Sequence, residues 1–160
     1  MAWLNLDNLW ASKTALMRLV ERYDLSGYRT SHLENQKLAY LLKVAGEPAL
    51  QGLIYRRSHH GPYAYNLSQA LEGMKGKDDY GQGRDRLVDR VSQLIAGFET
   101  PYGLEMLATL HWIAQEFPQA ADCEVAIARV QEWSDRKKNL FKPRHLEIAW
   151  DHLKAKGWLS

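Results

Sequence analysis

The stretch LEMLATLHWIA, Leu104 to Ala114, is the most informative part of the sequence for the fold, because it is apolar on nearly every side of the helix that its spacing predicts. A helix of this kind is usually central and buried. Thr100 and Pro101, just before it, form a typical helix start, with a capping hydroxyl followed by proline at the first helical position. We therefore expect a helical protein organised around this segment.

Apolar residues at helical spacing predict further helices on both sides of this segment. These lie in residues 9–23, 31–45, 67–74, 87–98, 122–133 and 143–153. Ser31 and Glu34 form a capping box at one start, and Gly46-Glu47-Pro48 ends that helix. Residues 50–57 are compatible with a short strand. The expected fold is mainly α, a compact single domain of about six or seven helices with at most a short β element near 50–57.

One domain, residues 1–160, is the default for a chain of this length. Within it we expect two halves, 1–74 and 85–160. The stretch KGKDDYGQGRD contains three glycines and no apolar stripe, so residues 75–84 are expected to form the connecting loop. Three helices followed by a short tail make the C-terminal half winged-helix-like.

Composition excludes several classes of protein. The net charge of +2 is too small to argue for nucleic acid by itself. The single cysteine excludes an internal disulfide framework and any zinc site built from several cysteines, and it fits a reducing cytoplasm. The N-terminus lacks the pattern of a signal peptide, and no apolar run approaches the ~18 residues of a membrane span. We expect a cytoplasmic protein without membrane contact.

No catalytic constellation is found. The pairs His59/His60 and His145/His152 lack the spacing and neighbouring acid of a helical zinc site. No Gly-x-Ser-x-Gly elbow or phosphate loop is present. Cys123 lies between two acids, which raise a thiol pKa, and His111 is expected to be a hydrogen-bonded core residue. The expectation is a chain that is not an enzyme, with no catalytic residue, metal or cofactor.

The stretch YRRSHHGPYAYNL, residues 55–67, is unusually rich in arginine, histidine and tyrosine. Gly61-Pro62 predicts a turn that would orient Tyr63 and Arg56 or Arg57. Rigid tyrosines and arginines commonly dominate binding energy at protein interfaces. The structural alternative, in which the tyrosines pack under the first helices and the arginines are merely exposed, is equally compatible with the sequence.

A basic cluster favours a second function. Six cations lie between the last two predicted helices: Arg129, Arg136, Lys137, Lys138, Lys142 and Arg144. Such a cluster can follow DNA phosphates, as in an autoregulating DNA-binding module. The alternative is a solvated helix end at which cations complement the helix dipole.

Several long segments resemble a known family. These are LENQKLAYLLKVAGEP, HHGPYAYNLSQALEGM, GFETPYGLEMLATLHWIA and HLEIAWDHLKAKGWL, which together run from about Leu33 to Leu159. They resemble the C-terminal domain of the DarG antitoxins, and the Gln-Lys-Leu, Gly-Glu-Pro and Gly-Pro-Tyr elements are similar to the broader Panacea-type antitoxin domain. DarG is a DNA ADP-ribosyl glycohydrolase whose N-terminal macrodomain removes ADP-ribose from DNA. It is paired with the toxin DarT, which modifies single-stranded DNA.

The resemblance implies a non-enzymatic domain that binds a DarT-like toxin and blocks its single-stranded DNA site, with DNA mimicry as one form of blockade. The partner of the domain in the full-length antitoxin is the covalently linked macrodomain, for which 160 residues leave no room. The family continues after LEGM through a longer insertion, whereas this chain has only the short stretch at 75–85. Because the net charge is slightly positive, mimicry requires a local acidic patch. The expected partner-binding residues are Arg56, Arg57, His60, Gly61, Pro62, Tyr63, Asn66, Glu72, Asp78, Asp79 and Tyr80.

Overall fold

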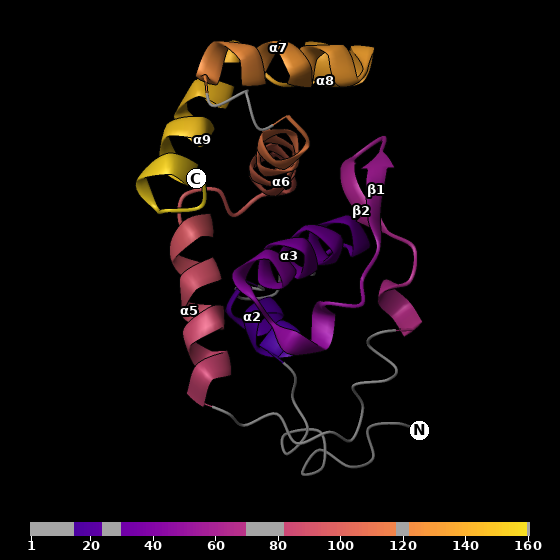
Figure 1. Cartoon of the computed structure of the whole chain (residues 1–160), viewed down its shortest axis with the longest axis vertical. Coiled ribbons are helices and arrows are strands. Elements are labelled where there is room, and N and C mark those ends of the chain that lie inside the picture. The colour runs from indigo at the N-terminus through magenta and orange to yellow at the C-terminus, as the bar shows by residue number, and fades with distance from the viewer. Residues whose placement is uncertain (1–14, 24–29, 70–81, 118–121, 160) are drawn as a thin grey trace.

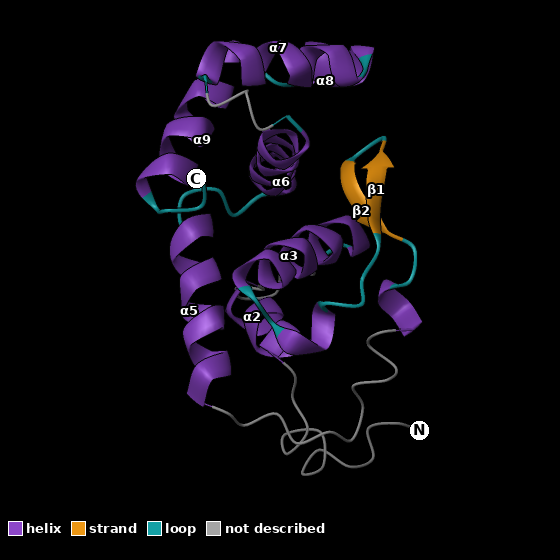
Figure 2. Cartoon of the chain, viewed as in Figure 1, coloured by secondary structure: helices purple, strands orange, loops and turns teal. Residues whose placement is uncertain are grey.

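The computed structural model describes residues 15–23, 30–69, 82–117 and 122–159, and it confirms the expected mainly α fold (Figure 2). The helices are α2 (Ala15–Tyr23), α3 (His32–Ala45), the 3-10 helix η2 (Pro48–Leu50), α5 (Gln82–Ile95), α6 (Pro101–Glu116), α7 (Cys123–Trp133), α8 (Asp135–Leu140) and α9 (Pro143–Ala155). Strands β1 (Tyr55–Ser58) and β2 (Gly61–Ala64) form one antiparallel hairpin. No helix in these ranges has the length and apolar character that crossing a membrane requires.

Helix α6 is the centre of the molecule (Figure 1). It packs against α3, α7, α9 and β2, and every residue from Gly103 to His111 is buried. The fully buried Leu107 and Leu110 each contribute roughly 1.5–3 kcal/mol relative to an exposed side chain. The apolar stretch from Leu104 to Ala114 therefore forms the core helix, as predicted.

The predicted helix ends are also confirmed. The Thr100 hydroxyl accepts a hydrogen bond from the Gly103 N–H at 2.9 Å, which satisfies one of the free donors at the start of α6. Ser31 and Glu34 form both halves of the capping box of α3. Gly46 ends α3 in the left-handed conformation with φ of 111°. Local side-chain chemistry thus sets the limits of the helices that enclose the core.

The β structure is larger than the sequence predicted. A full hairpin replaces the single short element, with Tyr55 opposite Ala64 and Arg57 opposite Pro62. The turn lies at His59 and His60, two residues earlier than expected, and Gly61 and Pro62 are instead the first residues of β2. Position 61 requires glycine, because its φ is 101° and an added Cβ would lie 2.8 Å from the Thr109 hydroxyl.

The C-terminal half differs from expectation in three respects. Helix α5 begins at Gln82, so the last part of the expected loop at 75–84 is helical, whereas 75–81 lie outside the described residues. Helix α8 was not predicted. Ranges 82–117 and 122–159 contain helices and no strand, so the β element of a winged-helix arrangement is not found there. The β structure that packs against α6 is the hairpin of residues 55–64, which belongs to the N-terminal half. Helix α5 of the C-terminal half packs against α2 and α3.

Candidate functional site

The β1–β2 hairpin is held by side chains from helix α3. Gln36 donates its Nε2–H to the Ala64 carbonyl and accepts the Ala64 N–H at Oε1, each at 2.8 Å. Lys37 donates from Nζ to the Pro62 carbonyl at 2.7 Å. Both helix side chains are buried, so these contacts are shielded from water.

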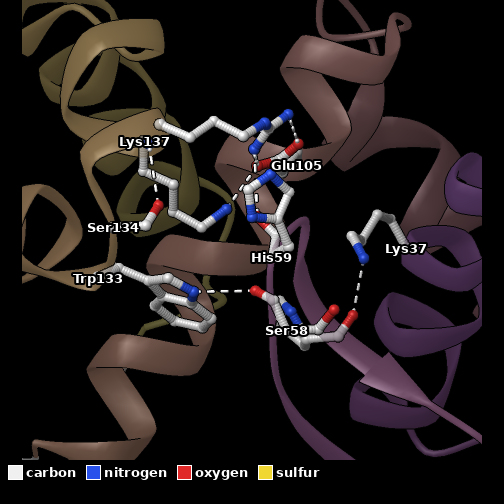
Figure 3. A network of polar contacts seen from close by, with 9 residues as sticks. Lys37, Ser58, His59, Glu105, Trp133, Ser134 and Lys137 are labelled. Atoms are coloured by element: carbon white, nitrogen blue, oxygen red, sulfur yellow. Dashed lines mark hydrogen bonds and ion pairs between the residues drawn. The ribbon is translucent and has the colours of Figure 1, made fainter.

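The other strand is held by α7 and α8. The Trp133 indole N–H donates to the Ser58 carbonyl at 2.9 Å, and Arg136 Nη1 donates to the His59 carbonyl at 3.2 Å (Figure 3). The hairpin is therefore fixed at its turn as well as along both strands. A surface fixed in advance loses little conformational entropy when it binds a partner.

Strand alternation divides the hairpin into two faces. One side carries Tyr55, Arg57, Pro62 and Ala64, and we call it the inner face. Pro62 and Ala64 are buried there, and the side chains of Tyr55 and Arg57 contact α3 and α6. Arg56 lies opposite Tyr63 in the ladder and faces the other way. Ile54 and Tyr65 each lie two residues from this pair along their strands, so they extend the same side. We call Ile54, Arg56, Tyr63 and Tyr65 the outer face.

The outer face presents large side chains to solvent. Tyr65 is 76% exposed and Ile54 is 62% exposed, the two highest values among the large hydrophobic residues described. The rings of Tyr63 and Tyr65 meet edge to face with centroids 4.9 Å apart. The Tyr63 hydroxyl lies 2.8 Å from His32 Nε2, which fixes the ring orientation. Tyr63 is half-buried and Tyr65 is exposed, and a fixed aromatic pair beside an exposed arginine is typical of a protein-binding surface.

Arg57 belongs to the inner face and has partners within the chain. Its guanidinium pairs with the Glu116 carboxylate, with Nε to Oε1 at 3.0 Å, and it stacks on the Trp133 ring at 4.3 Å from the centroid. Both arginines are exposed, as the structural alternative expected, but Arg57 is also held by contacts within the chain.

The remaining expected site residues fall into three groups. Gly61 and Pro62 are buried, and Asn66 holds the strand ends by accepting the Ile54 N–H at 3.1 Å and donating to the Gly52 carbonyl at 3.0 Å. His60 lies in the turn, beside a pocket formed with α3, α6 and α8. Four expected residues lie outside the described ranges: Glu72, Asp78, Asp79 and Tyr80.

A buried ion cluster lies beneath the hairpin turn (Figure 3). Glu105 accepts from Arg136 at 2.8 and 3.1 Å and from Lys137 at 2.5 Å. Burial raises the pKa of the Glu105 carboxyl, but the hydrogen bonds and charges of the two cations outweigh it and leave the pKa below its usual value. Burial lowers the pKa of Lys137, although the charge and hydrogen bond of Glu105 partly offset this by raising it. The carboxylate therefore stays ionised and ties α6 to α8.

A larger groove of about 680 Å³ lies on another side of α6, with Tyr40, His111 and Trp158 among its lining residues. The Tyr40 hydroxyl lies 2.7 Å from His111 Nδ1, so His111 is the hydrogen-bonded core residue that the sequence predicted. Burial lowers the pKa of His111 to about 4 and raises the pKa of Tyr40. Neither group exchanges protons readily near neutral pH, so the pair is unsuited to general acid–base chemistry.

Nucleophilic and metal chemistry have little basis in the described ranges. The pKa of the Cys123 thiol is raised, first by burial and then by nearby carboxylates that include Asp122 and Glu124, which leaves a poor nucleophile. His145 contacts the Tyr102 hydroxyl at 2.9 Å and His152 contacts the Leu94 carbonyl at 2.6 Å, so the two histidines have different partners. Residues 15–23, 30–69, 82–117 and 122–159 contain no group of three potential metal ligands.

The basic cluster is largely paired with acids. Arg136 and Lys137 bind Glu105, and Lys137 is fully buried. Arg129 pairs with Glu132 at 3.4 Å, and Arg144 pairs with Glu147 at 3.0 Å. Four of the six cations are thus paired with carboxylates within the chain, which reduces the charge available for phosphates.

Sequence reasoning missed several residues of this region. Ile54 and Tyr65 could have been found by extending strand alternation on both sides of a hairpin turn. No sequence pattern points to the other missed residues, Gln36, Lys37, Glu105 and Trp133. Each of them acts through a contact with a residue far away in the sequence.

Comparisons with known proteins find relatives that share one name. A DNA ADP-ribosyl glycohydrolase of Thermus aquaticus is 33% identical over 178 aligned residues, which cover 94% of this chain and 48% of that protein. Proteins of the same name from Mycobacterium tuberculosis and Mycobacterium bovis are 31% identical over 157 residues, covering 77% of this chain and 44% of theirs. The chain matches no model of a protein family.

These similarities span most of the described fold, including the core helix and the hairpin that packs on it. The chain spans about half the length of the curated relatives it matches. By sequence, it is a homologue of a part of proteins named DNA ADP-ribosyl glycohydrolase, the DarG proteins.

Proposed function

We propose that this chain is the toxin-binding domain of a DarG-type antitoxin and that it inhibits a DarT-like DNA ADP-ribosyltransferase in the cytoplasm. The observation that carries the proposal is the similarity over 94% of the chain to about half of a DNA ADP-ribosyl glycohydrolase. The segments that resemble the C-terminal domain of DarG antitoxins also run in order along most of the sequence. The glycohydrolase reaction belongs, in this proposal, to a macrodomain carried elsewhere in the full antitoxin.

The outer face of the hairpin is the proposed contact surface. Its tyrosines, arginine and isoleucine combine apolar area with polar tips, the composition enriched at interface hot spots. The helix side chains that fix the hairpin backbone support this assignment, because a preorganised surface avoids the entropic cost of ordering on binding. The side chains that provide this rigidity, such as Gln36 and Trp133, are positioning residues in the proposal.

The proposed inhibition is steric and competitive. A toxin that acts on single-stranded DNA needs a groove that stacks bases and holds phosphates. The adjacent rings of Tyr63 and Tyr65 present two aromatic surfaces that such a groove could accept in place of bases. The phosphate-holding groups would then meet carboxylates or backbone carbonyls, with Glu72, Asp78 and Asp79 as the proposed acidic contributors. The domain needs no catalytic group of its own for this function.

Duplex DNA binding in autoregulation is the second candidate, and it rests on the basic residues at Arg129–Arg144. Lys138 and Lys142 are the members of that cluster with no carboxylate partner among the described residues. Two exposed lysines provide a small phosphate-binding surface. The candidate predicts duplex binding that weakens steeply with salt, whereas toxin binding through the outer face would depend much less on salt.

Co-purification tests the leading proposal. The domain is mixed with the cognate DarT-like toxin and, separately, with a duplex containing the promoter of its own operon. Recovery of a toxin–domain complex, together with loss of toxin activity on single-stranded DNA, supports the proposal. Failure to recover the toxin under conditions in which both proteins are folded would refute it.

A further inference from the structure

A pocket of about 320 Å³ opens between α3, α6, α8 and the hairpin turn. Its charged and titratable lining residues include Glu34, Lys37, His60, Glu105 and Arg136. Leu33 and Leu140 lie among its apolar lining residues, and Leu140 is 38% exposed. A charged interior with an apolar rim is the form of a site for a charged group on a short aliphatic stem.

The fixed charges around this pocket do not balance. The cations Lys37, Arg136 and Lys137 accompany the carboxylates Glu34 and Glu105, which leaves one positive charge in excess when all five groups are ionised. Burial lowers the pKa of Lys37 to about 8, so its ammonium is still mainly protonated at pH 7. His60 does not alter this sum near neutral pH, because its pKa is lowered by burial and by the neighbouring Arg136. An excess charge in the protein interior is costly unless a counter-ion approaches it.

Lys37 is the cation without a carboxylate of its own. Its side chain is buried, with 2% exposure, and its one hydrogen bond is to the Pro62 carbonyl. Glu105 is shared by Arg136 and Lys137, and Glu34 is bound by the Tyr23 hydroxyl and the Ser31 cap. Lys37 therefore borders the pocket with ammonium donors that no described residue uses.

We propose that this pocket binds a single monoanionic carboxylate, presented by an aspartate or glutamate side chain of the protein partner. One negative charge balances the excess at Lys37, and the apolar rim accommodates the methylene stem. A phosphate dianion fits less well, because Glu34 and Glu105 line the same pocket and repel the second charge. The identification of the partner as the toxin rests on the proposed function. The affinity of the pocket for a carboxylate is independent of that function.

A titration with sodium propionate, a mimic of an acidic side chain, tests the site without any partner. Backbone and side-chain NMR signals are followed at constant ionic strength, with sodium chloride as the reference and inorganic phosphate in a parallel series. The expected result is saturable shifts at Lys37, His60 and Arg136 with propionate, and at least fivefold weaker binding in Lys37→Met. Shifts that do not saturate, equal binding in Lys37→Met, or tighter binding of phosphate would each overturn the proposal.

A second pair of variants keeps the test decisive if Lys37→Met does not fold. Leu140→Glu supplies a carboxylate at the rim, and Leu140→Gln is its uncharged match. Leu140→Glu is expected to be the more heat-stable variant at pH 7 and to lose that advantage once the carboxylate is protonated near pH 4. It is also expected to abolish propionate binding, because its own carboxylate occupies the site. Equal melting temperatures at pH 7 combined with unchanged propionate binding would contradict the proposal.

These experiments distinguish a failure of the proposed carboxylate site from a failure of the proposed toxin-binding function. Propionate binding in a domain that recovers no toxin would support the pocket and refute the toxin assignment. Toxin binding that is unchanged by Leu140→Glu, in a domain that does bind propionate, would refute the partner's side chain as the occupant.

Discussion

Gln36 and Ala64 exchange two hydrogen bonds of 2.8 Å, one in each direction, in the manner of two residues on paired strands. The amide of a helix side chain thus takes the place of a third strand beside β2. Because both groups of Ala64 are buried and satisfied by one residue, the position of the hairpin on α3 depends on Gln36.

Gln36→Leu is expected to destabilise the fold by roughly 2–3 kcal/mol, because it leaves the Ala64 N–H and carbonyl buried without their partner. Denaturant unfolding measures the change. Gln69→Leu, an exposed glutamine after the same hairpin, is the matched control and should change stability by less than about 0.5 kcal/mol. Equal effects of the two substitutions would show that the amide contacts do not hold the hairpin.

Gly61→Ala is expected to be more damaging than Gly46→Ala. Both glycines have positive φ, at 101° and 111°, so both variants carry backbone strain. Only the Cβ at position 61 meets an atom at 2.8 Å, the Thr109 hydroxyl, whereas the space at Gly46 is open. The predicted difference is about 1–3 kcal/mol in the free energy of unfolding.

A double substitution separates the clash from the strain. In a Thr109→Ala background, the extra cost of Gly61→Ala should shrink, because the contacting hydroxyl is gone. An unchanged cost in that background would mean that close packing against α6 does not explain the glycine.

Acid should weaken the fold through His111. Burial lowers its pKa from 6.5 to about 4, so between these pH values the unfolded chain binds a proton that the folded chain does not. The contribution is fully present above pH 6.5 and is lost as the pH falls to about 4, for a total on the order of 3 kcal/mol. Unfolding free energies of the wild type and His111→Gln, measured from pH 7 to pH 4, should converge or cross. Parallel curves would contradict this explanation.

The helical core was predictable from sequence because its determinants are local. The capping hydroxyl of Thr100 acts within three residues, and the apolar pattern of Leu104–Ala114 needs no knowledge of distant segments. The hairpin site was only partly predictable. Whether Arg56 or Arg57 faces outward depends on the register with β2, and the Glu116 and Trp133 contacts of Arg57 join residues 59 and 76 positions apart.

The outer face predicts which substitutions weaken toxin binding. Tyr65→Ala or Arg56→Ala should cost ~1–2 kcal/mol of binding energy with little change in stability, because both side chains are exposed. Ile148→Ala, which also removes an exposed apolar side chain but lies on α9, is the matched control. Calorimetric titration with the toxin measures the affinities. Normal binding by a folded Arg56→Ala, Tyr65→Ala double variant would show that the contact surface lies elsewhere.

Arg57→Ala should behave differently from Arg56→Ala. Removing the Arg57 guanidinium breaks the contacts with Glu116 and Trp133, so thermal stability should fall. Any loss of toxin affinity should then be partly restored at lower temperature, where the hairpin remains fixed. A stable Arg57→Ala variant with a large binding defect would instead make Arg57 a direct contact.

The most direct test is a competition titration with the purified domain, the cognate DarT-like toxin and a labelled single-stranded DNA that carries the toxin's target sequence. The account predicts that increasing domain displaces the DNA completely and that the Arg56→Ala, Tyr65→Ala double variant needs a higher concentration to do so. A ternary complex, in which the domain binds while the DNA remains bound, would contradict competitive inhibition through this face.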